Sequence, residues 1–289
     1  MSGGLCIDLH THTACSDGTL TPAQLVLRAA DAGIEVLAIT DHDTTAGFEQ
    51  AEGCAAAGGI ELVPGVEISA AWRAQAIHVL GLWIDPAAPP LRRALALQAE
   101  HRCRRMVRIC ERLTALGLPG ARLLQTVESQ PGLPTRAHLA QALIEAGVVR
   151  RSDDAFRKYL GRGTAAHVAA DWPALDVVVG WIVAAGGIAS LAHPARYRLS
   201  GGARRALLAD FKAAGGGAIE VITGANAAGQ IEACAGWAQR FGFEASIGSD
   251  FHGPQHVWNP LGRLAKLPDR VTPVWRRLES SGTKKQPLQ

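Results

Sequence analysis

Short apolar runs recur along the whole chain, and several of them are followed at once by a histidine or a carboxylate. Each run is between five and seven residues long, a length typical of a β-strand that is buried on both faces. The runs that predict strands cover residues 5–9, 35–40, 60–66, 77–83, 187–192, 218–222 and 244–248.

Segments predicted as helices separate most of these runs. The first helix is expected to begin with Thr21 as its N-cap and Pro22 at its first position, where the missing N–H costs nothing. Either Thr44 or Thr45 is expected to cap the second. The predicted helices of this kind cover about 22–32, 45–58, 173–185, 204–214 and 227–241.

This alternation of strands and helices predicts a parallel sheet with crossover helices. About seven strands favour an α/β fold with a closed or distorted (β/α)7 barrel, and an open doubly wound sheet is the alternative. Between the fourth and fifth strands the pattern changes, and helices are predicted at 91–116, 136–146 and 153–160. We therefore expect a barrel domain, 1–90 and 168–289, that is interrupted by an inserted helical cap domain, 91–167.

Composition excludes several classes of protein. The chain is 48% hydrophobic and 19% charged, with a net charge of +3, which is too mild to indicate nucleic-acid binding by itself. Its six cysteines form no Cys-x-x-Cys pair, which favours reduced thiols and a cytoplasmic location. We expect no signal peptide and no membrane span, and nothing in the sequence implies a protein partner.

Histidines and carboxylates gather at the predicted strand ends. His10 and His12 lie two positions apart, so in extended backbone both imidazoles point to the same side. In a parallel barrel the carboxyl ends of the strands share one rim, where active sites lie. The residues placed there are His10, His12, His42, Glu67, His193, Asp250 and His252. Imidazole and carboxylate without thiolate suit hydrolytic Mn, Fe or Zn sites. The ligands are too many for one ion, so we expect two or three, with a carboxylate such as Glu67 bridging a pair.

Five short motifs in order resemble those of the PHP (polymerase and histidinol phosphatase) family of metal-dependent phosphoesterases, which are related to amidohydrolases. They are HTHT at 10–13, TDHD at 40–43, PGVE at 64–67, AHP at 192–194 and SDFH at 249–252. The resemblance implies a distorted seven-stranded barrel with a trinuclear site, and it favours Mn²⁺, with Zn²⁺ or Fe²⁺ as alternatives.

The resemblance also implies a ligand set for each metal. The first metal would take His10, His12, Glu67 and Asp250. The second would take Glu67, His78 and His193. The third would take Asp17, His42 and His252, with Asp17 standing where some relatives have histidine.

Hydrolysis of a phosphate ester needs a nucleophile at neutral pH, and a hydroxide bridging two metal ions would supply it. Asp41 and Asp43 flank His42 without being assigned as ligands. Either could orient a ligand histidine or move a proton, and helix N-capping is the alternative for Asp43.

Residues of the predicted cap and rim are candidates for substrate binding. The segments around Arg136 and His138 and around Lys158 resemble a PHP subgroup that acts on nucleotide 3′,5′-bisphosphates and on the 5′ ends of short RNA. These three side chains could bind a phosphate that is not cleaved, or form ordinary surface salt bridges. Arg196 could contact the scissile phosphate, and Asn226 could contact ribose or base or stabilise a turn.

The sequence thus predicts a phosphatase that removes the 3′-phosphate of a nucleoside 3′,5′-bisphosphate such as 3′-phosphoadenosine 5′-phosphate. A 5′→3′ exoribonuclease acting on short RNA is the first alternative, and a histidinol-phosphate-type phosphatase is the second. The non-enzymatic alternative is a metal-dependent binding or regulatory domain.

Overall fold

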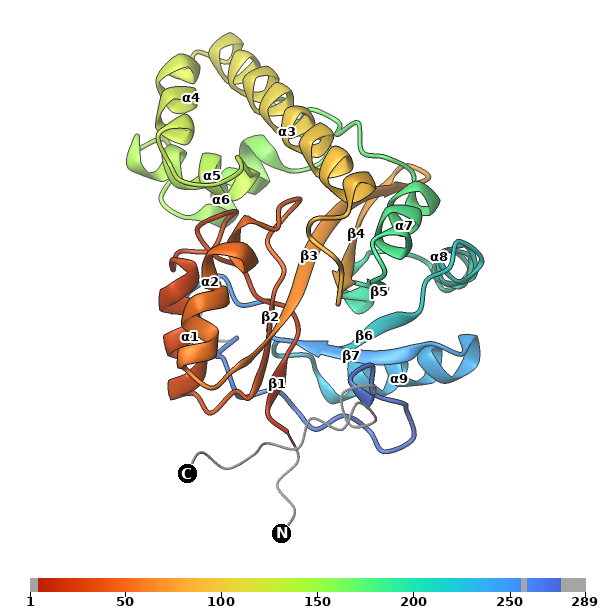
Figure 1. Ribbon diagram of the computed structural model, residues 1–289. Helices are drawn as coiled ribbons and strands as arrows, with labels where there is room; N and C mark the ends of the chain where they lie inside the picture. Colours follow the sequence, from red (N-terminus) through yellow and green to blue (C-terminus); the bar gives the residue numbers. More distant parts are fainter. Residues whose placement is uncertain (1–4, 256–258, 277–289) are drawn as a thin grey trace.

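Seven strands follow one another around a single sheet in chain order within the described residues, 5–255 and 259–276, of the computed structural model (Figure 1). The strands are β1 (Ile7–Asp8), β2 (Val36–Ile39), β3 (Glu61–Trp72), β4 (Gln75–Leu82), β5 (Ile188–Leu191), β6 (Ala218–Thr223) and β7 (Glu244–Gly248). Beyond β1 the sheet meets β7 again, because the Leu9 N–H donates to the Ile247 carbonyl over 3.0 Å. The predicted (β/α)7 barrel and its seven strand positions are confirmed.

The direction of β4 differs from the prediction of a wholly parallel sheet. Strand β4 runs antiparallel to both β3 and β5, whereas the other neighbouring strands pair in parallel. Only Arg73 and Ala74 separate β3 from β4, and a parallel crossover needs a dozen residues or more. The prediction was therefore wrong for this strand. The hairpin brings the first half of β4 to the end of the barrel where β1 and β2 finish, since His78 pairs with Ser69 of β3.

Helices surround the barrel as the alternation predicts. They are α1 (Pro22–Asp31), α2 (Ala46–Ala57), α7 (Leu175–Ala184), α8 (Gly201–Ala213) and α9 (Ala228–Phe241), with a short 3₁₀ helix η2 (Pro194–Arg196). The Thr21 cap is confirmed, because its side chain accepts from the Gln24 N–H at 3.3 Å and Gln24 Oε1 accepts from the Thr21 N–H at 2.9 Å. Thr45 precedes α2 but makes no capping hydrogen bond there.

A group of helices between β4 and α7 gathers at one end of the barrel (Figure 1). It consists of α3 (Pro89–Ala115), α4 (Gly120–Glu128), α5 (Arg136–Glu145), α6 (Ser152–Ala155) and the π-helical turn η1 (Phe156–Leu160). These helices have a hydrophobic cluster of their own, in which Met106, Leu113 and Leu139 are buried. Helix α4 was not predicted from the sequence. No helix within 5–255 or 259–276 is long and apolar enough to cross a membrane.

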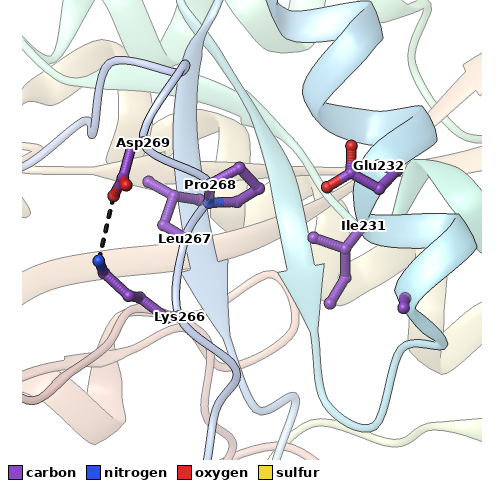
Figure 2. A pocket seen from close by; sticks show the side chains of 7 residues that line it. Ile231, Glu232, Lys266, Leu267, Pro268 and Asp269 are labelled. Carbon is purple, nitrogen blue, oxygen red and sulfur yellow. Dashed lines mark ion pairs between the residues drawn. The ribbon is translucent and has the colours of Figure 1, made fainter.

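A shallow pocket of about 330 Å³ lies between α9 and the segment 266–269 (Figure 2). An ion pair of 3.1 Å joins Lys266 to Asp269 at its edge, and Ile231 and Glu232 form the opposite wall. None of the metal ligands expected from the sequence lines this pocket.

Candidate metal centre

The nine residues predicted as metal ligands converge at one rim of the barrel. They come from the segments after β1, β2, β5 and β7 and from the hairpin β3–β4. Side-chain contacts of 2.9 to 3.7 Å connect them into one network. His78 reaches it because β4 is antiparallel, which places the start of that strand at the rim.

The first group of donor atoms lies around His10 and His12. His10 Nε2 and His12 Nε2 lie 3.1 Å apart, and each lies 3.3 Å from Asp250 Oδ1. Glu67 Oε2 lies 3.5 Å from the former nitrogen and 3.4 Å from the latter. Ligands at about 2.0–2.2 Å from a tetrahedral ion stand about 3.3–3.6 Å from one another, so the donors of His10, His12 and Glu67 are spaced much as ligands of one cation, and Asp250 lies beside both histidines.

The carboxylate of Glu67 faces two groups at once. Its second oxygen, Oε1, lies 2.9 Å from His78 Nδ1 and 3.1 Å from His193 Nε2. The side chain is buried, which opposes ionisation, yet the imidazoles of His42, His78 and His10 hold its pKa well below the ordinary value. An ionised carboxylate with one oxygen toward each group has the geometry of a bridging ligand.

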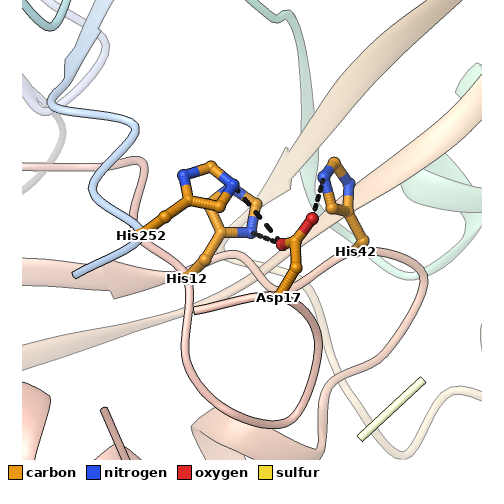
Figure 3. A group of neighbouring side chains, drawn as sticks. All are labelled: His12, Asp17, His42 and His252. Carbon is orange, nitrogen blue, oxygen red and sulfur yellow. Dashed lines mark ion pairs between the residues drawn. The ribbon is translucent and has the colours of Figure 1, made fainter. Parts of the chain in front are cut away.

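A third group surrounds Asp17 (Figure 3). Asp17 Oδ1 lies 3.4 Å from His252 Nε2, and Oδ2 lies 3.7 Å from His42 Nε2. His12 also belongs to this group, because its Nδ1 lies 3.7 Å from Asp17 Oδ1 while its Nε2 faces Glu67. His42 is shared as well, since its Nδ1 lies 2.9 Å from Glu67 Oε2. These two imidazoles therefore stand between groups that the resemblance keeps separate.

Electrostatics favour a cation in this network. Burial raises the pKa of Asp17 and Asp250, but the surrounding histidines outweigh it and hold both values well below the ordinary one. For His252, burial lowers the pKa, but Asp17 and Asp250 outweigh it and raise the value to about 10. The pKa of His12 falls to about 3 through burial and the neighbouring His252, so this imidazole is in the neutral form that binds metals.

Glu220 of β6 is a buried residue of the site that sequence reasoning missed. Its Oε1 lies 2.9 Å from His10 Nδ1, which leaves His10 Nε2 to face the first group. Its Oε2 accepts the backbone N–H of His193 at 2.5 Å. A carboxylate behind a ligand imidazole fixes its tautomer and orientation. The available signal was a glutamate in the middle of an apolar strand.

Asp41 holds the loop that carries Asp17. Its Oδ1 accepts from the Thr13 N–H at 2.7 Å and from the Ser16 hydroxyl at 2.6 Å, and its Oδ2 accepts from the Thr13 hydroxyl at 2.6 Å. Burial raises the pKa of Asp41 to about 6. These contacts support the orienting role, and a proton-transfer role for Asp41 stays a prediction.

Asp43 connects the barrel to α3. Its Oδ2 accepts from Arg102 Nε at 2.6 Å, and its Oδ1 accepts from the Ser69 N–H at 2.8 Å and from Gln98 Nε2 at 3.1 Å. Asp43 does not cap α2 through these contacts, because all three partners lie outside that helix. A proton-transfer role for Asp43 likewise stays a prediction.

Arginines of the helical region approach the rim from the side of Asp43. The guanidinium carbons of Arg102 and Arg105 lie 5.3 and 5.8 Å from the centre of the Trp172 ring. Burial, together with the positive charges of Arg136 and Arg102, lowers the pKa of Arg105 to about 10. Within residues 5–255 and 259–276, neither Arg105 nor Arg136 forms an ion pair with a carboxylate. We call Arg102, Arg105 and Arg136 the arginine group.

The other predicted substrate-binding residues lie in different surroundings. His138 accepts the Thr135 N–H at 3.1 Å, and its pKa, lowered mainly by burial, also responds to the charge of Asp17. Lys158 is exposed on η1, and its phosphate contact stays a prediction. Arg196 forms an ion pair with Asp250.

A polar cleft of about 430 Å³ adjoins the rim on the side of β6 and β7. Its lining residues are Arg196, Thr223, Ala225, Asn226, Gln230, Asp250, His252 and Asn259. Asn226 therefore lies next to two predicted ligands, as a substrate contact would require. Its Oδ1 also accepts the Thr223 N–H at 2.5 Å, which is the turn-stabilising role that the sequence left open.

Comparison with known proteins gives consistent matches. Residues 8–146 match the model of the PHP domain. The chain is 42% identical to a 5′-3′ exoribonuclease of Haemophilus influenzae over 93% of this chain and 98% of that protein. It is 40% identical to a 3′,5′-nucleoside bisphosphate phosphatase of Chromobacterium violaceum over 95% of this chain and 96% of that protein. A solved structure of an amidohydrolase from C. violaceum with bound sulfate superimposes with a TM-score of 0.88, at 40% identity, over 95% of this chain and 96% of that one.

Proposed function

Because this chain belongs to the PHP domain family of metal-dependent phosphoesterases, we propose that its substrate is a nucleoside 3′,5′-bisphosphate, from which it removes the 3′-phosphate. With 3′-phosphoadenosine 5′-phosphate, the products would be AMP and inorganic phosphate. The C. violaceum relative is named for this substrate class, and it is similar to the present chain over nearly its whole length.

The observation that carries the proposal is the arginine group beside the metal centre. Arg102 reaches both places, because it contacts Asp43 next to His42 and also lies against Trp172 beside Arg105. Arg105 and Arg136 are half-buried and donate to the Val168 and Leu160 carbonyls, but neither pairs with a carboxylate among the described residues. Both can therefore bind an anion, and guanidinium matches phosphate geometry. A substrate with two phosphates would place one at the metals and the other at these arginines.

Two or three divalent ions would occupy the centre, held by the nine predicted ligands, with Mn²⁺ as the proposed metal and Zn²⁺ or Fe²⁺ fitting the same donors. The donor spacing around His10 and the three ionised carboxylates, Asp17, Glu67 and Asp250, both fit such ions. When bound, the ions would lower the pKa of water and neutralise charge on the phosphoryl oxygens.

The residues of the chain would prepare this site in three ways. Glu220 orients His10, and Asp41 fixes the loop that carries Asp17. Arg196, which pairs with Asp250 at the edge of the centre, would bind an oxygen of the scissile phosphate. We further propose that the helices of 91–167 form a cap domain that brings the arginine group to the barrel, and that the protein works in the cytoplasm.

A 5′→3′ exoribonuclease is the second candidate, and the name of the H. influenzae relative supports it. Both activities break the bond between phosphorus and the 3′ oxygen of a 5′-phosphorylated nucleotide, so one site can perform both. A histidinol-phosphate-type phosphatase would leave the arginine group without a role. A purely regulatory domain would leave the nine assembled side chains of the predicted ligands without a catalytic role.

Release of inorganic phosphate from the Mn-loaded protein tests the proposal. The substrates to compare are 3′-phosphoadenosine 5′-phosphate, AMP and histidinol phosphate, each with and without chelator. Chelator-sensitive release from the bisphosphate alone is expected, and His10→Ala should abolish it. Release mainly from histidinol phosphate would refute the nucleotide assignment while keeping the metal centre.

A further inference from the structure

The polar cleft beside β6 and β7 borders the metal centre, and two residues line both. Asp250 and His252, both predicted ligands, line it together with Arg196. The remaining lining residues are the last residue of β6, two residues of the segment after it, Gln230 in the first turn of α9, and Asn259. A molecule in this cleft would therefore lie next to a phosphoryl group held at the metals.

The arginine group reaches the metal centre from a different side. Arg102 connects this group to the rim, because it donates to Asp43, which follows β2, and to Ser69 in β3. The cleft, by contrast, opens beside β6 and β7, and no residue of 91–167 is among its lining residues. The metal centre thus separates two polar regions, and a substrate crossing it would have one part in each.

The cleft is held in shape by its own amide side chains. Asn259 Oδ1 accepts the Ala225 N–H at 3.0 Å, and Gln230 Oε1 accepts the Ala227 N–H at 3.0 Å. Gly224, at φ +54°, packs so closely that an added Cβ would stand 2.4 Å from Asn259 Oδ1. With their oxygens used by the backbone, the amide groups can offer N–H donors to a ligand.

The chemistry of the lining fits a nucleoside. Amides and the Thr223 hydroxyl are neutral hydrogen-bonding groups, which suit ribose hydroxyls and base edges. The volume of about 430 Å³ falls within the range of small-molecule sites, about 300–1,000 Å³. Ala225 and Gln230 are exposed at the edge, so a longer chain could continue into solvent.

We infer that this cleft binds the second nucleoside of a 5′-phosphorylated RNA, the one attached through its 5′ oxygen to the scissile phosphate. The inference rests on the proposed function. The first nucleotide would have its 5′-phosphate at the arginine group, as the bisphosphate does. In a bisphosphate the scissile phosphate ends in free oxygens and the cleft stays unused, whereas in RNA the same phosphate continues into the cleft. Water adds its hydroxyl to phosphorus and a proton goes to the departing 3′ oxygen, releasing the first nucleotide as a 5′-monophosphate.

Three substrates separate the cleft from the rest of the site. They are adenosine 3′,5′-bisphosphate, 5′-phosphoadenosine 3′-methylphosphate, and the 5′-phosphorylated dinucleotide of adenosine. The last two are both diesters and differ in the second nucleoside alone. For the wild type we expect kcat/KM on the dinucleotide to exceed that on the methyl diester by about tenfold or more, the gain from one or two hydrogen bonds.

Ala225→Trp fills the cleft without changing charge. It should bring the ratio of kcat/KM on the dinucleotide to kcat/KM on the methyl diester to about 1. Its kcat/KM on the bisphosphate and on the methyl diester should stay within about twofold of the wild type, since neither substrate has a second nucleoside to place in the cleft. Ala233→Trp makes the same change at an exposed position of α9 that is not among the lining residues, and it should keep the wild-type ratio.

The following results would contradict the inference. A wild-type ratio near 1, or an unchanged ratio in Ala225→Trp, means that the second nucleoside binds elsewhere. Loss of bisphosphate turnover in folded Ala225→Trp means that the cleft serves the first nucleotide. Failure of the wild type on the bisphosphate itself would instead refute the proposed function.

Discussion

Arg102 donates from Nε to Oδ2 of Asp43 over 2.6 Å, and this buried ion pair joins the helical region to the metal centre. Gln98, one turn earlier on α3, donates to Asp43 Oδ1 and to the Ser69 carbonyl. Asp43 follows the predicted ligand His42, and Ser69 lies two positions beyond the predicted ligand Glu67 in β3. Helix α3 therefore contacts residues close to two predicted metal ligands, although it provides no ligand itself.

Replacing Arg102 should damage stability and metal binding together. In Arg102→Met the Asp43 carboxylate loses its buried partner, which should lower the free energy of unfolding by about 3–5 kcal/mol. Arg104→Met is the matched control, because Arg104 is exposed and pairs with Glu100, and it should cost less than about 1 kcal/mol. Urea unfolding and Mn stoichiometry measure both effects. Equal stability of the two variants would contradict a supporting role for the ion pair.

Glu220→Gln should weaken metal binding while the fold is kept. The amide can still accept the His193 N–H through its oxygen, but it no longer presents a carboxylate to His10 Nδ1. Loss of such a partner typically costs about 10–100-fold in metal affinity. Mn titration by calorimetry measures the change, with Glu232→Gln, an exposed glutamate paired with Arg270, as control. Unchanged Mn affinity in Glu220→Gln would remove Glu220 from the site.

Much of the fold and of the predicted ligand set could be read from the sequence, because both depend on local pattern. Buried strands appear as short apolar runs, and ligands that follow strands appear immediately after those runs. His78 is instructive, since it stands near the start of its strand and only the antiparallel hairpin explains how it reaches the rim. The predicted strands at 60–66 and 77–83 left ten residues between them, so the two-residue link after Trp72 became visible only in the structure.

What the sequence did not reveal depends on tertiary packing. Glu220 contacts His10 across 210 positions, so its role follows from the arrangement of strands and not from any motif. On α3, Arg105 lies over Trp172 and donates to the Val168 carbonyl, whereas Arg104 of the same helix is exposed. Helix α4 was missed because Gly117, Pro119 and Gly120 interrupt the pattern at its start.

Arg136→Ala should separate substrates with one phosphate from substrates with two. If Arg136 binds the 5′-phosphate, kcat/KM on adenosine 3′,5′-bisphosphate should fall by about 10–100-fold, the cost of losing hydrogen bonds to a charged group. Turnover of adenosine 3′-monophosphate, which has no second phosphate, should change by less than about threefold. Arg151→Ala, at an exposed arginine of the same region, is the control. Equal losses on both substrates would show that Arg136 does not read the second phosphate.

The buried thiol of Cys110 should make the helical region sensitive to alkaline pH. Burial, aided by the charge of Glu128, raises the pKa of Cys110 from 9.0 to about 11. Below pH 9 the thiol is protonated in both folded and unfolded chains, so its full contribution to stability is present. As pH rises from 9 through about 11 the unfolded chain loses this proton first, and the free energy of unfolding falls. Urea unfolding between pH 8 and 10.5 should therefore show a shallower decline for Cys110→Ala than for the wild type. Cys103→Ala, at an exposed thiol of the same helix, should keep the wild-type decline, and a parallel decline in all three proteins would assign the effect to other groups.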